Sequence, residues 1–138
     1  MLGEFFALGP QQIDERLLIE GPHGRFPAVR ARGLGPVNFA RLGEILGDGT
    51  YDEVFAEAVA EHQEAPNGES GVLAVPATVC EGLARNSDLE YVADRWVATE
   101  ELRLARWEAH DALGVREQLA ELVGAREPNQ TIWYWWSL

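Results

Sequence analysis

The chain has 138 residues, the usual length of one domain and enough to bury a core. Hydrophobic residues make up 46% and charged residues 25% of it, which is a globular rather than a disordered composition. The formal net charge of −12 argues against nucleic acid and anionic lipid as partners, because their phosphates need a basic surface.

The first elements alternate between strand and helix patterns. Residues 5–8 form a short apolar run that Gly9-Pro10 ends, and Pro10 suits the first position of a helix. That helix would carry Ile13, Leu17 and Leu18 on one side. Residues 26–32 alternate apolar and arginine side chains, which predicts a half-exposed strand, and Pro27 favours a sheet edge.

Two helices are expected next. Gly35-Pro36 begins the first, whose apolar stripe ends at Gly47. Thr50 and Glu53 have the spacing of a capping box, which predicts a second helix over residues 51–64. This second helix would bury Tyr51, Phe55, Ala58 and Val59 and would expose Glu53, Glu57, Glu61 and Glu64.

The second half of the chain begins with a turn at residues 65–68 and an apolar strand at 71–75. A short helix should follow Pro76, with Val79, Cys80 and Leu83 facing inward. Ser87 and Glu90 form another possible capping box before an amphipathic stretch at 89–97. A further amphipathic stretch covers 113–123, and residues 131–138 have the composition of a strand.

This order of elements predicts the fold class. Strands lie near both ends, helices lie between them, and no regular βαβ alternation is present. We therefore expect one compact α+β domain over residues 1–138. Its small, mostly antiparallel sheet would include the N- and C-terminal strands and would pack against about five helices.

The acidic residues are strongly segregated. Between Leu42 and Ala84 there are nine acids and no lysine or arginine. Glu53, Glu57 and Glu61 lie at i, i+4 and i+8 of the predicted helix, where each like-charge pair costs about 0.2–0.5 kcal/mol. Either this is a solvated face, or Glu53, Glu57, Glu61 and Glu64 form an acidic ridge that binds a basic protein partner, with Tyr51 or a terminal tryptophan as the anchor.

The C-terminal strand is rich in aromatic residues. Trp133 and Trp135 should face one side of it, and Tyr134 and Trp136 the other. Since neither side is polar, a central strand covered by protein is one interpretation. The other is that one face stays open as an aromatic anchor for a partner.

The sequence offers little evidence for catalysis. His23, His62 and His110 have no second ligand at metal-site spacing, and Cys80 is the only cysteine. Adjacent carboxylates such as Asp52-Glu53 and Glu100-Glu101 are not selective among 23 acids. We predict no catalytic residue, no metal and no cofactor, and a non-enzyme is favoured over an enzyme.

Location and source can also be inferred. The first residues lack the pattern of a signal peptide, and no run of 18 apolar residues could span a membrane, so we expect a cytoplasmic protein. The basic residues are all arginine, and Ala, Gly, Leu and Glu are abundant. That usage indicates a bacterial genome of high GC content.

In layout, the chain resembles the small acidic immunity proteins of bacteria, which bind and neutralise a cognate toxin. The resemblance rests on a short apolar first strand, acidic amphipathic helices and a closing aromatic strand. It implies a non-enzymatic role in which an acidic patch blocks a basic cleft. Two alternatives remain: a small hydrolase or transferase that uses clustered carboxylates, and a structural homo-oligomer in which the arginines of one copy meet the acids of another.

Overall fold

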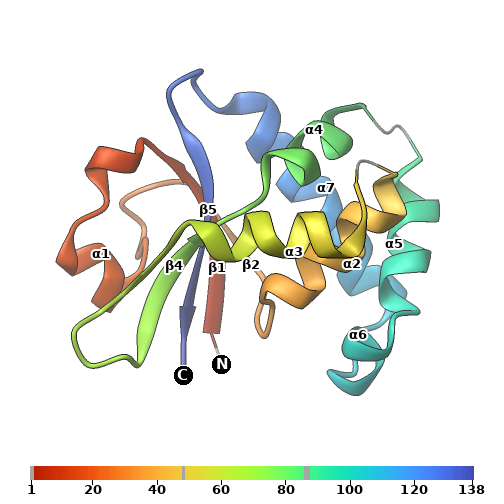
Figure 1. Cartoon of the computed structure of the whole chain (residues 1–138), viewed down its shortest axis with the longest axis horizontal. Helices are drawn as coiled ribbons and strands as arrows, with labels where there is room; N and C mark the ends of the chain where they lie inside the picture. Colours follow the sequence, from red (N-terminus) through yellow and green to blue (C-terminus); the bar gives the residue numbers. More distant parts are fainter. Residues whose placement is uncertain (1, 48, 86–87) are drawn as a thin grey trace.

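A single five-stranded antiparallel sheet organises the chain, and the strands at the two ends of the sequence lie at its centre. The computed structural model describes residues 2–47, 49–85 and 88–138. The strands are β1 (Leu2–Leu8), β2 (Ala28–Arg30), β3 (His62–Glu64), β4 (Ser70–Ala74) and β5 (Thr131–Ser137). Their order is β2-β1-β5-β4-β3, and β1 pairs with β5 from Leu2 opposite Ser137 to Leu8 opposite Thr131. The two termini therefore lie side by side (Figure 1).

Helices cover both faces of this sheet. They are α1 (Glu15–Glu20), α2 (Pro36–Leu46), α3 (Tyr51–Ala60), α4 (Ala77–Arg85), α5 (Leu89–Val97), α6 (Glu100–Leu104) and α7 (Ala109–Ala125). The segment with α1 lies on one side of the sheet, and the other helices lie on the opposite side (Figure 1). The predicted single α+β domain is confirmed. The described residues form seven helices rather than about five, and the sequence pattern gave no sign of the five-residue α6.

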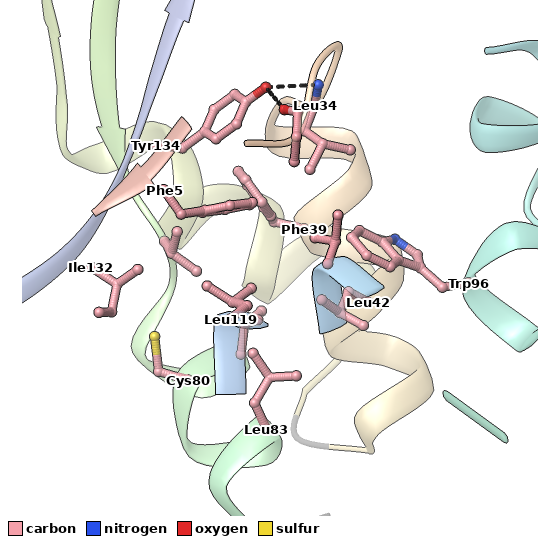
Figure 2. Packing of buried hydrophobic residues seen from close by; sticks show 14 of the residues in the cluster. Phe5, Leu34, Phe39, Leu42, Cys80, Leu83, Trp96, Leu119, Ile132 and Tyr134 are labelled. Carbon is pink, nitrogen blue, oxygen red and sulfur yellow. Dashed lines mark hydrogen bonds between the residues drawn. The ribbon is translucent and has the colours of Figure 1, made fainter. Parts of the chain in front are cut away.

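The alternation of β5 divides the core in two. Ile132 and Tyr134 are fully buried against α2, α5 and α7, together with Phe5, Phe39, Trp96 and Leu119 (Figure 2). Trp133 and Trp135 face the other side, where Phe6, Leu17 and Val72 complete a smaller core beneath α1. The interpretation of the aromatic run as a central strand is therefore confirmed, with residues 132–135 covered on both faces and Trp136 half-buried.

One predicted helix is wrong at its end. The helix expected over 51–64 stops at Ala60, and residues 62–64 form β3 instead. The turn at Asn67-Gly68 folds the chain back, so that Ala65 N–H donates to Ser70 O and Ala74 N–H donates to Glu61 O, both at 2.9 Å. This hairpin gives β4 a partner on its outer side, which a longer helix would leave unpaired.

The positions expected to be buried in α3 are also partly wrong. Val54 and Ala58 are its fully buried residues, while Tyr51 and Phe55 are half-buried and Val59 is 47% exposed. The apolar stripe is therefore rotated from its expected position, and Val59 lies at its exposed margin.

Two other boundaries need comment. The helix expected after Pro10 is divided into a 3₁₀ turn at Pro10–Gln12 and α1, because the Asp14 carboxylate accepts a hydrogen bond from Leu17 N–H and starts a new helix. The capping box predicted at Ser87 lies outside the described residues. Its described neighbour Asp88 accepts a hydrogen bond from Tyr91 N–H at the start of α5.

The longest helix, α7, has 17 residues. None of the helices in the described parts of the chain has the length and apolar character needed to cross a membrane.

Candidate functional site

Two members of the predicted acidic ridge have roles within the fold. Glu53 completes the capping box of α3, where its carboxylate accepts from Thr50 N–H at 3.4 Å and its own N–H donates to Thr50 Oγ1 at 3.3 Å. Glu57 reaches across to the start of α4, where Oε1 accepts from Ala77 N–H at 2.7 Å and Oε2 accepts from Thr78 Oγ1 at 3.0 Å. The carboxylate of Glu57 therefore caps α4 from a different helix, and it also complements the positive end of the α4 dipole.

The other two members lie beyond the helix. Glu61 is exposed and is the C-terminal capping residue of α3, and Glu64 is exposed on the edge strand β3. The carboxylate of Glu64 lies 3.8 Å from the imidazole of His62. The structure thus divides the predicted ridge into a pair that caps helices and a pair beside β3.

Tyr51, the predicted anchor, is held by its neighbours. Its ring stacks on Phe55 with the centroids 6.0 Å apart, and the guanidinium of Arg41 lies 4.6 Å from the centroid of the Tyr51 ring. The ring is half-buried, so only part of it could contact a partner.

An apolar hollow of about 290 Å³ opens between the C-terminal end of α3, the start of α2 and the sheet. Its lining consists of Leu34, Gly35, Pro36, Ala58, Val59, His62, Leu73 and Trp136. Trp136 is half-buried, and its ring stacks on His62 with the centroids 6.0 Å apart and an angle of 17° between the planes. We name this feature the β3 hollow. It combines an exposed valine with a terminal tryptophan, the kind of anchor that the sequence suggested.

The free edge of β3 lies next to this hollow. The hydrogen bonds of Glu61 and Ala65 to β4 set the ladder, and backbone partners alternate along an antiparallel pair. The N–H and C=O groups of His62 and Glu64 therefore point away from β4. An edge strand with such groups can pair with an extended segment of another protein.

The hollow is held in place by a buried tyrosine. The Tyr134 hydroxyl donates to Ala31 O at 2.5 Å and accepts from Leu34 N–H at 3.2 Å, as Figure 2 shows for Leu34. Burial raises the pKa of Tyr134 to about 12, so the hydroxyl stays protonated and keeps donating at neutral pH. These two bonds fix the segment from Ala31 to Leu34, which leads into the wall of the β3 hollow.

No set of three His, Cys, Asp or Glu side chains in the described parts of the chain is arranged to hold a metal ion. Cys80 is 1% exposed, and burial raises the pKa of its thiol to about 11, so it is packed as a small apolar residue.

Comparisons of the chain with models of protein families, with curated proteins and with solved structures found no match.

The sequence pattern missed the β3 hollow. Leu34, Val59 and Trp136 come from three separate parts of the chain, and no local pattern brings them together. The available signal was the number of aromatic residues in β5, since a strand with no polar face must have each ring covered or used in binding.

Proposed function

We propose that the protein is a protein-binding module that captures a basic protein partner, and that it acts as an immunity protein that neutralises a toxin. The β3 hollow is the observation that carries this proposal. An apolar hollow beside an open strand edge can accept an extended segment whose backbone pairs with β3 and whose apolar side chain enters the hollow.

The surrounding charge supports a basic partner. Glu61 and Glu64 flank His62 on the exposed edge, and the described residues that line the hollow include no arginine. Arginine or lysine side chains of the partner would face carboxylates there, which raises the association rate and disfavours acidic competitors.

The proposal changes which acids should be tested. Glu57 caps α4, so its replacement would alter the fold as well as the surface. Glu61 and Glu64 offer their carboxylates to solvent and are the better probes of binding.

The test uses the protein encoded by the reading frame next to this gene. We expect that protein to be basic, to arrest growth when expressed alone, and to form a complex with this chain in isothermal titration calorimetry. Charge reversal by E61K with E64K should weaken the complex at least tenfold and flatten its salt dependence, and V59E should weaken it through the hollow.

A matched control is available on α7. Glu121 is exposed and lies on a different element. E121K therefore reverses one charge, as E61K or E64K does, but away from the hollow. If E121K weakens binding as much as either reversal beside β3, or if the neighbouring protein neither binds nor is neutralised, the proposal is wrong.

A further inference from the structure

The β2 edge of the sheet carries a basic region, although the chain as a whole is acidic. Two hollows of about 550 and 190 Å³ lie on either side of β2, and both are lined by Arg30, Ala31 and Arg32. The larger one also contains His23, Glu4 and Trp135, and the smaller one Arg106, Trp107, Asp111 and Val115. We name the smaller hollow the arginine hollow.

The arginines of this hollow are largely uncompensated. Arg30 lies 3.6 Å from a Glu4 oxygen, but its side chain is 92% exposed. Arg32 and Arg106 are exposed and form no ion pair with a carboxylate in the described parts of the chain. Three arginines and one carboxylate, that of Asp111, line this small hollow, so its lining is net positive in a chain with 23 acids.

The acid in the arginine hollow is already engaged. Asp111 Oδ2 accepts from Glu108 N–H at 2.9 Å at the start of α7, and Oδ1 lies 3.4 Å from the His110 imidazole. Asp111 keeps its negative charge, but no ion pair joins it to Arg32 or Arg106 in the described parts of the chain, and the lining stays net positive.

Backbone conformation supplies an independent observation. Among the described residues, the non-glycine residues with positive φ are His23, at 41°, and Arg106, at 60°. Each lines one of the two hollows beside β2. Left-handed backbone is unfavourable for side chains with a Cβ, and it persists where surrounding structure or function requires it.

Arg106 occupies a position that normally selects glycine. Trp107 N–H donates to Leu102 O and Arg106 N–H donates to Arg103 O, both at 3.0 Å, which is the Schellman motif at the end of α6. Glycine would fill the left-handed position of this motif without strain. An arginine there adds no hydrogen bond to the motif, so its contribution comes from the side chain.

We propose that the arginine hollow binds the oxyanion of a small organic molecule, a phosphate or a carboxylate, through Arg32 and Arg106. Guanidinium groups match both anions with paired hydrogen bonds. Trp107 and Val115 offer an apolar surface to the rest of the molecule. This site lies at the opposite edge of the sheet from the β3 hollow, and the inference stands without the proposed protein partner.

The test titrates the whole chain with phenyl phosphate and with phenylacetate, followed by calorimetry and by the Nε–H signals of the arginines in NMR. We expect one of the two to bind and to shift the signals of Arg32 and Arg106; the preferred probe identifies the anion. R32Q and R106G should each weaken binding at least tenfold.

The control is Arg103, which is exposed on α6 and lines neither hollow. R103Q removes the same charge and should change the affinity less than twofold. If R103Q lowers the affinity as much as R32Q and R106G do, the effect is one of net charge and the proposal is wrong. It is also wrong if neither probe binds at millimolar concentration. A fall in oligomeric mass for R32Q or R106G in sedimentation would instead assign the arginines to contacts between copies, and would also overturn it.

Discussion

The two edges of the sheet differ in how they use their charges. On the acidic side, Glu53 and Glu57 of the predicted ridge form hydrogen bonds at the starts of α3 and α4, and Glu61 and Glu64 lie exposed beside β3. Beside β2, Arg32 and Arg106 are far apart in the sequence, where the arginines suggest contacts between copies, yet both are exposed and line a common hollow. A run of like charge is therefore a weak guide to a binding surface, and charge without a partner in the folded chain is a stronger one.

The two edges also share an anchor. The Tyr134 hydroxyl bonds Ala31 and Leu34, and between these two residues the chain passes from the arginine hollow to the β3 hollow. A substitution at this anchor should therefore disturb both hollows, whereas substitutions at one edge of the sheet should affect only the hollow on that edge.

The largest expected effect comes from Gly3, which leaves space for the Tyr134 hydroxyl. A Cβ at Gly3 would overlap that hydroxyl and would lie 2.7 Å from Ala31 O. We expect G3A to lower the free energy of unfolding by about 3 kcal/mol, measured by urea denaturation. G114A is the control, because open space surrounds that position in α7; it should leave stability unchanged or raise it by up to about 1 kcal/mol. Equal stability of G3A and the parent would contradict the role of the anchor.

The same anchor should make the fold sensitive to alkali. Burial raises the pKa of Tyr134 from 10.0 to about 12, so the folded state favours the neutral hydroxyl. This contribution is complete below pH 10, and it is lost as the pH rises to about 12, by on the order of 2–3 kcal/mol. Urea denaturation between pH 9 and 12 measures it. Y134F should start less stable but should lose less across that range; a parallel decline in both proteins would refute the assignment.

Glu57 and Glu61 provide the sharpest contrast on the acidic edge. E57A removes both hydrogen bonds at the start of α4 and should cost about 1 kcal/mol of unfolding free energy. E61A should change it by less than about 0.5 kcal/mol, because the backbone carbonyl of Glu61, and not its carboxylate, bonds Ala74. Thermal and urea denaturation of the two variants test this. If both lose a similar amount of unfolding free energy, Glu57 has no special role in the fold and is again a candidate for partner binding.

On the basic edge, replacing a charged residue should raise the stability of the fold instead of lowering it. R106G relieves the left-handed conformation at the end of α6, and we expect it to stabilise the fold by a few tenths to about 1 kcal/mol. The same variant should lose anion binding, so stability and binding change in opposite senses. If R106G destabilises the protein, the arginine side chain supports the fold and the argument from strain fails.

Several features of the fold could be predicted because their signals are local. Pro36 and Gly47 mark the ends of α2, Thr50 and Glu53 mark the start of α3, and the alternation in β5 assigns its two faces. The end of α3 could not be predicted in this way. Its last turn competes with a strand whose partner, β4, follows it in the chain.

The candidate sites depend on longer-range contacts. The hydrogen-bonding partners of Glu57 lie 20 and 21 positions further along the chain. Arg32 lies on a turn after β2 and Arg106 on a loop after α6, and both line the arginine hollow. No periodicity or spacing encodes such distances, so the acidic ridge looked unexplained and the arginine hollow could not be seen.

By itself, the sequence determined that this is one α+β domain with an acidic middle segment, since composition, caps and apolar periodicity act over a few neighbouring residues. Only the tertiary structure decided which charges are used within the fold and which face solvent. That choice depends on whether another element supplies a hydrogen-bonding partner. Glu57 finds one at the start of α4, and Arg106 remains exposed beside an open hollow.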